Sequence, residues 1–204
     1  MVSYWLAIVL LALAWRSADS CMCSAKEAHP QTQYCKSDFV IVGRVQRLMT
    51  TKEGFNTYKV KIRNYFKATP KAELALKSGI FTPAIESMCG ITLQPRETYV
   101  ISGRIDFLKA HVNICNYVRK WREVTARQRK GFRLLYKQGC TCKVHMYWNS
   151  PSRRRTPNRN TCIAQMDSCH TKHGICLRKG YCKWTRAPAL TRCIQSENLN
   201  TTKT

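Results

Sequence analysis

Acidic residues are few in this sequence, which has 11 Asp and Glu residues against 35 Lys and Arg and a formal net charge of +24. It contains no His-Glu-x-x-His motif, no Gly-x-Ser-x-Gly nucleophile elbow and no pair of carboxylates arranged as an acid and a base. It also lacks an aromatic-rich RNA motif and a helix-turn-helix pattern. We therefore expect neither an enzyme nor a nucleic-acid-binding protein.

Long apolar runs are absent after the first 20 residues. The run from Tyr4 to Trp15 fits the core of a signal peptide and is too short to span a membrane. Ala18 and Ser20 supply the small-x-small pattern of a cleavage site. We predict that residues 1–20 are a signal peptide, that the protein is secreted rather than membrane-spanning, and that Cys21 is the first mature residue.

Cysteine is abundant, and all 12 cysteines follow residue 20. An even, dense set after a signal peptide predicts six disulfides formed in an oxidising compartment. The excess of cations predicts binding to sulfated glycans and retention in the extracellular matrix. The candidate glycan-binding residues lie in one basic loop: Arg153, Arg154, Arg155 and Arg159. A solvated loop that binds no ligand is the open alternative. Asn200 begins a glycosylation sequon.

Hydrophobic patterning predicts a mainly β protein. Strands are expected over 38–45, 57–63, 97–105 and 110–118, with Tyr58, Val60 and Ile62 facing a core. Helices are expected over 69–79 and 121–139, and Gly43 and Gly103 are expected at bulges or corners. These elements suit a small closed β-barrel with flanking helices over residues 21–140. Residues 141–204 hold six cysteines and little apolar sequence, which predicts a small disulfide-rich β domain.

Several motifs occur in an order that resembles one family, the tissue inhibitors of metalloproteinases. They are "CMC" at 21–23, "HPQTQYC" at 29–35, "SDFVIVGRV" at 37–45, "TPAIESMCG" at 82–90, "ICNY" at 114–117 and "QRKGF" at 128–132. The motifs cover the whole first domain, and "YCKW" at 181–184 extends the likeness into the second. The resemblance implies that the barrel is five-stranded and of the oligonucleotide/oligosaccharide-binding (OB) type.

The resemblance also implies a stoichiometric inhibitor of zinc metalloproteases, such as matrix metalloproteinases or adamalysin-type sheddases. The α-amine and carbonyl of Cys21 would chelate the catalytic zinc of the target, and Met22 would enter its primary specificity pocket. The flanking contacts implied are Cys23, Ser24, Ala25, Ile85, Glu86, Ser87 and Met88. For Ile85 and Met88, simple burial is an equally open alternative. The zinc belongs to the target, so we expect no cofactor, no intrinsic metal and a monomer.

The resemblance implies the disulfides Cys21–Cys89, Cys23–Cys115, Cys35–Cys140 and Cys142–Cys182. Cys176 remains open to pairing with Cys162 or Cys169, and Cys193 takes the remaining partner.

Two other interpretations compete with the inhibitor. A netrin-like module shares the barrel but binds matrix or glycans without inhibiting a protease. In such a module the first residue of the mature protein would not be Cys21. An intrinsic zinc site could use Cys169, His170, His173 and Cys176. Disulfides are far commoner than zinc thiolates in secreted chains, so the zinc site is the weaker alternative.

Overall fold

The structure is a computed structural model that describes residues 21, 23, 29–147, 158–166 and 168–201. The predicted signal peptide lies outside these residues. Within the last helix, α7 (Pro188–Thr201), the side chains of residues 198, 200 and 201 are likewise not described.

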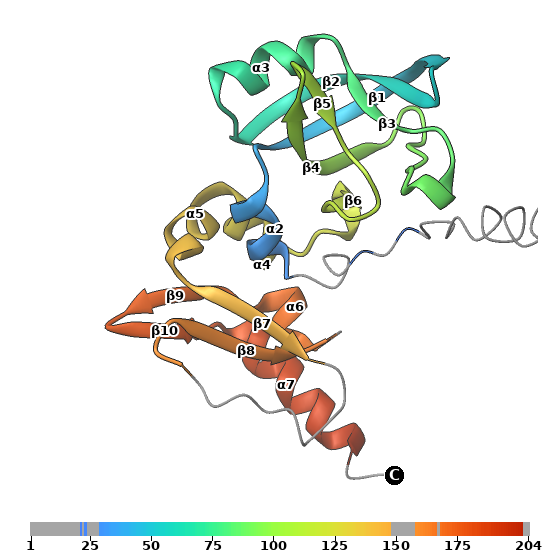
Figure 1. The fold of residues 1–204 in the computed structure, drawn as a ribbon. Helices are drawn as coiled ribbons and strands as arrows, with labels where there is room; N and C mark the ends of the chain where they lie inside the picture. The colour runs from blue at the N-terminus through green and yellow to red at the C-terminus, as the bar shows by residue number, and fades with distance from the viewer. Residues whose placement is uncertain (1–20, 22, 24–28, 148–157, 167, 202–204) are drawn as a thin grey trace, which may run out of the picture.

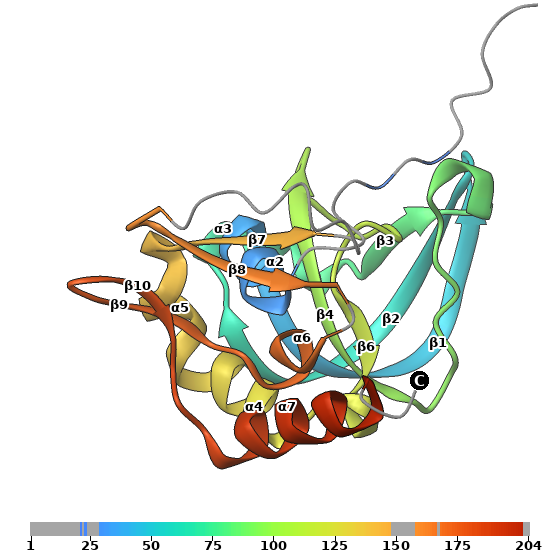
Figure 2. The same ribbon diagram turned by 90° about the horizontal axis from the view of Figure 1, so that it is seen from below.

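Five strands of the first part form a ring. They are hydrogen-bonded in the order β1-β2-β3-β5-β4, and β4 pairs back with β1, while the short strand β6 pairs with residues 99–101 of β4. Figures 1 and 2 show how these strands curve around to form the ring. The strands are β1 (Phe39–Lys52), β2 (Phe55–Lys67), β3 (Ile80–Pro83), β4 (Thr98–Asp106), β5 (Lys109–His111) and β6 (Val118–Lys120).

Alternation along β2 places apolar side chains inside the ring, as the sequence predicts. Tyr58 is buried and Val60 and Ile62 pack against the same core, whereas Lys59, Lys61 and Arg63 are exposed. The opposite strand shifts register at Gly43, where a Cβ would collide with Val60, so the expected bulge is present. The interior is completed by Phe39, Ile41, Val45, Ile80, Leu93, Ile101 and Val112.

Two short helices pack against the ring, α3 on its interior core and α2 on its outer face. Helix α3 (Pro70–Lys77) begins as predicted, with Thr69 accepting a hydrogen bond from the backbone N–H of Ala72 and Pro70 at the first turn. Helix α2 (Pro30–Lys36) was not predicted. Its Tyr34 joins Val42 and Val100 from the outer sheet face in a second buried cluster with Phe132, Tyr136 and Ile175.

The single helix predicted over 121–139 is wrong. Residues Trp121–Glu123 form a 3-10 turn and Val124 is extended, because Thr125 caps a new helix with Gln128 in a capping box. The chain continues as α4 (Ala126–Lys130), a π-helical turn (Gly131–Leu135) and α5 (Tyr136–Gln138). At Gly131 a Cβ would collide with the ring of Tyr136, so glycine allows this close packing.

The strand predicted over 110–118 is also wrong as a single element. It divides into β5 and β6, and residues between them form a loop. The side chain of Asn113 accepts a hydrogen bond from the backbone N–H of Cys115 (3.0 Å), and that of Asn116 accepts one from Asn113 (2.9 Å). These local side-chain bonds compete with strand pairing and bend the chain there.

The described residues of the C-terminal part form two small sheets and two helices. Strand β7 (Lys143–Tyr147) runs parallel to β8 (Thr161–Gln165), and β9 (Cys176–Lys179) forms a hairpin with β10 (Tyr181–Trp184). Helix α6 (Cys169–His173) packs against α7 (Pro188–Thr201), which the sequence did not predict. The C-terminal part has two small buried clusters. The disulfides in or beside them are Cys142–Cys182, Cys162–Cys176 and Cys169–Cys193.

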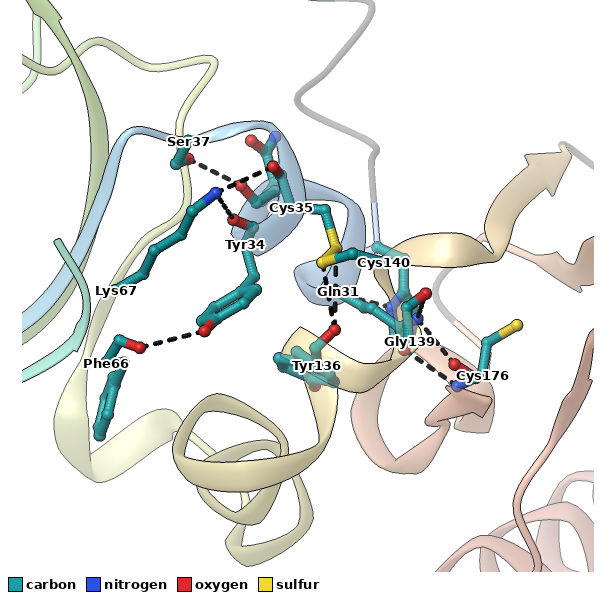
Figure 3. The surroundings of a disulfide bond; sticks show 12 residues. Gln31, Tyr34, Cys35, Ser37, Phe66, Lys67, Tyr136, Gly139, Cys140 and Cys176 are labelled. Carbon is teal, nitrogen blue, oxygen red and sulfur yellow. Dashed lines mark hydrogen bonds between the residues drawn. A yellow bond between two sulfur atoms is a disulfide. The ribbon is translucent and has the colours of Figure 1, made fainter. Parts of the chain in front are cut away.

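Helix α2 joins the two parts of the chain. The side-chain amide of Gln31 donates to the carbonyls of Gly139 (2.9 Å) and Cys176 (2.8 Å) and accepts from the N–H of Cys176 (2.9 Å) (Figure 3). The disulfide Cys35–Cys140 ties the same helix to the end of the helical segment. Because Gln31 is buried, its hydrogen bonds fix the C-terminal part against α2.

His29 adds a second polar contact at this junction. Its Nδ1 accepts from the backbone N–H of Gln31 (3.1 Å), so Nε2 carries the proton and donates to the carbonyl of His170 (3.0 Å). The ring is fully buried beside Trp184 and Tyr136. Burial lowers the pKa of His29 from 6.5 to about 4.

We predict that acid destabilises the protein through His29. Between pH 6.5 and about 4 the unfolded chain binds a proton that the folded chain excludes, so the free energy of unfolding falls by up to about 1.4 kcal/mol per pH unit. Denaturant unfolding of wild type and His29→Asn at several pH values measures this contribution. The variant should be less stable at pH 7 and show a shallower loss on acidification; equal slopes would contradict the assignment.

The β4–β5 turn provides a second prediction. Phe107 and Leu108 have φ angles of 42° and 58°, which are unfavourable for bulky residues, and their side chains are exposed. Leu108→Gly should raise the free energy of unfolding by about 1 kcal/mol, because glycine adopts this conformation without a Cβ penalty. Leu74→Gly, at an exposed position of α3, should instead lower it by about 1 kcal/mol. A loss of stability in both variants would refute strain at the turn.

Candidate functional site

Two disulfides bring the "CMC" segment to one end of the ring. Cys21 is bonded to Cys89, after β3, and Cys23 to Cys115, after β5; the Cα–Cα distance is 5.2 Å in each. The Sγ atoms of Cys21 and Cys23 lie 3.8 Å apart. We call Cys21, Cys23 and residues 85–89 the ridge. One disulfide joins Cys21 to Cys89 within the ridge, and the other joins Cys23 of the ridge to the loop of Cys115.

The loop of Cys89 is a tight turn. Residues Glu86–Met88 form one turn of 3-10 helix, and Cys89 follows in the left-handed conformation with φ of 65°. The N–H of Gly90 returns to the carbonyl of Ile85 (3.0 Å), and a Cβ at Gly90 would collide with the carbonyls of Pro83 and Ile85. The glycine of "ESMCG" therefore closes the turn that holds Cys89 in place.

The side chains of this turn point into solvent. Ile85 is 55% exposed and Met88 57% exposed, and Glu86 and Ser87 are exposed as well. Burial, the alternative left open for Ile85 and Met88, is wrong. Two large apolar side chains exposed beside the Cys21–Cys89 disulfide form a small apolar surface without an intramolecular use, which suits contact with another molecule.

The loop of Cys115 is held by residues that sequence reasoning missed. The Nε2 of Gln33 donates to the carbonyl of Cys115 (2.8 Å), which links the loop to α2. The N–H of Ile114 donates to the carbonyl of Cys89 (2.9 Å), so the two cysteine loops are bonded directly to each other. The two asparagines around Cys115 were the available sequence signal, whereas nothing in the sequence marks Gln33 as a partner.

Among the residues that the structure describes, no pair of ionisable groups at the ridge is arranged as an acid and a base. Glu86 is the one carboxylate in residues 21–25 and 85–89. Tyr117, two residues after Cys115, has a raised pKa because its phenol is buried. The ridge offers backbone, disulfides and apolar side chains, which are means of binding rather than of acid–base catalysis.

Several predicted residues lie outside the described part of the chain: Met22, Ser24, Ala25, Arg153, Arg154 and Arg155. Arg159 is exposed, and its carbonyl accepts from the N–H of Cys182 (2.7 Å). Asn200 falls within α7.

The six disulfides decide between the cysteine pairings that the sequence left open, and they bear on the alternative zinc site. They include the four pairings that the resemblance implies, and the open set pairs as Cys162–Cys176 and Cys169–Cys193. Cys169 and Cys176 therefore supply no thiolate to the alternative zinc site at 169–176. Among the helices that the structure describes, none has the length and apolar character needed to cross a membrane.

Comparison with known proteins gives a consistent result. The family model described as "Tissue inhibitor of metalloproteinase" matches residues 19–184. The "Tissue inhibitor of metalloproteinase" of Drosophila melanogaster is 30% identical over 203 residues, covering 94% of each chain. "Metalloproteinase inhibitor 3" of Gallus gallus is 31% identical over 89% of this chain and 90% of its own. "Metalloproteinase inhibitor 4" of Mus musculus is 27% identical over 91% and 90%.

The matched range extends over both parts of the chain and spans the positions of the ridge cysteines. Members of this family are inhibitors, so the expectation that the chain is not an enzyme is confirmed. From the motifs, the ridge and the length of the match together, we conclude that this chain belongs to the tissue inhibitor of metalloproteinase family.

Proposed function

We propose that this protein is a secreted inhibitor of zinc metalloproteases that binds their catalytic zinc through the α-amine and carbonyl of Cys21. The observation that carries the proposal is the double crosslink of the "CMC" segment beside the exposed side chains of Ile85 and Met88. Removal of residues 1–20 would leave Cys21 with a free amine at the tip of this rigid feature.

The chemistry follows from what a catalytic zinc site needs. Such a site keeps one coordination position for the water that attacks the substrate. The α-amino nitrogen and carbonyl oxygen of one residue close a five-membered chelate, which displaces that water. A free α-amine titrates near 7.7–8.0, and only its neutral form donates a lone pair. Zinc must compete with a proton, so binding should weaken as the pH falls below this range.

The disulfide at Cys21 has two roles in this mechanism. It removes a thiol that would otherwise compete for zinc as a flexible ligand. It also holds the backbone of Cys21 before the target arrives, which lowers the entropy lost on binding. The Cys89 turn and the hydrogen bond from Ile114 to Cys89 stiffen the loop that carries the other sulfur.

Met22 would occupy the primary specificity pocket, since it follows the chelating residue directly. Its flexible thioether side chain adapts to deep apolar pockets, so we propose a preference for proteases that have them. Ser24 and Ala25 would continue the contact along the substrate cleft. Ile85, Glu86, Ser87 and Met88 would contact the other side of the cleft.

The division of the chain is part of the same proposal. Residues 21–140 would form the inhibitory domain, with the five-strand ring as its OB-type closed barrel. Residues 141–204 would tune the choice of partner or retention in the matrix. The protein would act as a monomer, with no cofactor of its own.

A non-inhibitory, netrin-like matrix module is the alternative function. The two differ at one position, because an inhibitor needs its amine at Cys21 and a matrix module does not. Amino-terminal sequencing of the secreted protein therefore discriminates between them, and a start at any residue other than Cys21 favours the matrix module.

A single added residue tests the chelate. Mature protein with one alanine before Cys21 should lose inhibition of a matrix metalloproteinase catalytic domain by roughly 100-fold or more, because the amine becomes an amide. Inhibition constants, measured alongside thermal melting, check this. Wild-type protein acetylated on its lysines but not at its α-amine serves as the control. Full inhibition by the extended protein would refute zinc binding by Cys21.

The apolar side of the ridge gives a separate test. Ile85→Ser should weaken inhibition about tenfold or more, since burying an isoleucine side chain at an interface contributes roughly 1.5–3 kcal/mol. Leu74→Ser is the matched control, because Leu74 is 57% exposed but lies on α3. Both variants should melt close to the wild-type temperature. Equal inhibition by Ile85→Ser and wild type would remove residue 85 from the contact.

A further inference from the structure

The turn between β4 and β5 presents two large apolar side chains to solvent. Phe107 is 90% exposed, whereas the other large apolar side chains on the described surface are between 36% and 65% exposed. Leu108 follows it and is 56% exposed. Asp106 pairs with Lys109 across the two strands, so the turn consists of Phe107 and Leu108 alone. We call these two residues the tip.

The backbone of the tip has an unfavourable conformation for the residues that occupy it. Both have positive φ, as a two-residue hairpin turn with this twist requires, and asparagine and glycine adopt such angles most readily. A phenylalanine and a leucine here destabilise the fold, and neither side chain compensates by packing in the core, because both are exposed. Residues held in such conformations cluster at sites that bind other molecules. The strain therefore points to a function for the tip outside the fold itself.

The hairpin below the tip is anchored to the ring. The N–H of Ile105 donates to the carboxylate of Asp38 (2.8 Å), and the N–H of Asp38 donates to the carbonyl of Gly103 (2.9 Å). Ile105 pairs with Ala110 across the hairpin, and both belong to the interior of the ring or pack against it. The tip is thus carried by a fixed support rather than a long loop, so little conformational entropy is lost when it binds.

Cations lie directly behind the tip. Arg104 and Lys109 are exposed, and Asp106 is the one carboxylate in residues 104–111. The Nζ of Lys109 lies 5.2 Å from the centroid of the Phe81 ring, which positions this ammonium group beside the turn. The whole chain has a formal net charge of +24. Both the local and the overall charge attract the tip to anionic surfaces.

The shape and surroundings of the tip favour a lipid bilayer as its partner. A protein partner in a stable complex covers about 800 Å² of each surface, but the side chains that flank this small protrusion are charged. A bilayer needs no such area, since apolar side chains enter the boundary between headgroups and acyl chains while cations remain among the headgroups. Aromatic rings suit that boundary, and each basic residue near an anionic membrane adds attraction.

We propose that the tip inserts into bilayers that contain anionic lipids. Phe107 and Leu108 enter the apolar edge of the bilayer, and Arg104 and Lys109 pair with the anionic headgroups. The strain of the turn keeps both apolar side chains at the point of the hairpin, where they reach the bilayer first. This inference goes beyond protease inhibition and does not rest on zinc binding by Cys21.

Insertion of the tip leaves the ridge accessible. The tip precedes β5 and the loop of Cys115 follows it, so the two leave this strand at opposite ends. Strand β3 runs parallel to β5, and the loop after β3 carries Cys89. Both loops that hold the ridge therefore extend from the end of β5 that is remote from the lipid. Protein bound to a membrane should inhibit a soluble protease as well as free protein does.

The experiment uses the mature full-length protein and large unilamellar vesicles. One set of vesicles is phosphatidylcholine alone, and the other is equal parts of phosphatidylcholine and phosphatidylserine. Phe107→Ser and Leu108→Gly each remove one apolar side chain of the tip. Leu134→Ser is the matched control, because Leu134 is 60% exposed but lies in the π-helical turn outside the ring. Sedimentation with the vesicles measures binding, alongside melting temperature and inhibition of a metalloproteinase catalytic domain.

Both tip variants should bind the mixed vesicles at least about tenfold more weakly than wild type, since each loses the burial of a large apolar side chain. Leu108→Gly should at the same time melt at a higher temperature, so its weaker binding could not reflect misfolding. Wild type should bind phosphatidylcholine alone more weakly than the mixture. Leu134→Ser should bind like wild type, and inhibition should be the same in all variants, with or without vesicles.

A reporter residue separates insertion from adsorption by charge. Phe107→Trp places an indole at the tip, and Leu134→Trp places one at the control position. With lipids brominated on their acyl chains, the added fluorescence of Phe107→Trp over wild type should be quenched, because bromine quenches an indole that enters the bilayer. The added fluorescence of Leu134→Trp should not change.

Three results would overturn the proposal. Wild-type protein that stays in solution with both kinds of vesicle would exclude a lipid partner and leave a protein with an apolar pocket as the partner of the tip. Equal binding by the tip variants and wild type would show that charge alone causes adsorption. Unquenched Phe107→Trp would exclude insertion. Failure of the zinc-binding proposal would appear separately, as full inhibition by the alanine-extended protein with vesicle binding intact.

Discussion

Covalent attachment of Cys21 and Cys23 to two neighbouring loops is the constraint on which the proposed site depends. A peptide end that is free in solution loses much conformational entropy when it binds a metal. Here that entropy is lost during folding, because the disulfides to Cys89 and Cys115 fix both cysteines against the ring. The hydrogen bond from the N–H of Ile114 to the carbonyl of Cys89 joins the two loops, so that neither moves independently of the other.

The ring of strands gives this support its stiffness. Strands β3 and β5 run parallel beside each other, and the loops that follow them carry Cys89 and Cys115. Ile80 begins β3 and Val112 directly follows β5, and both are fully buried in the core. Displacement of either loop would therefore disturb the packed interior, and interiors at crystal-like density resist such changes.

Much of the ring could be predicted from the residues alone. The alternation of Tyr58, Val60 and Ile62 with lysines gave β2, and Thr69 with Pro70 gave the start of α3. These signals are local and need no tertiary partner. The sequence likewise indicated which cysteines form the ridge, although only through a family resemblance.

Other features depended on contacts that a linear pattern does not contain. Residues 110–118 have the composition of a strand, but Asn113 and Asn116 bond to the backbone and break it. The segment 121–139 has helical composition, but the Thr125 capping box restarts the helix. The exposure of Ile85 and Met88 follows from a turn closed by Gly90, and an apolar residue in a short loop gives no indication of whether it is buried.

Gln31 has a consequence for how far the two parts of the chain can be treated as separate modules. Its amide satisfies backbone groups of Gly139 and Cys176, one on each side of the boundary near residue 140. In a chain cut at that boundary, the Nε2 and Oε1 atoms of Gln31 would lose their hydrogen bonds to the backbone of Cys176. The cut would also remove Ile175 from the buried cluster that contains Tyr136. Exchange of C-terminal parts between relatives would therefore need to preserve this match between the Gln31 amide and the backbone of the second part.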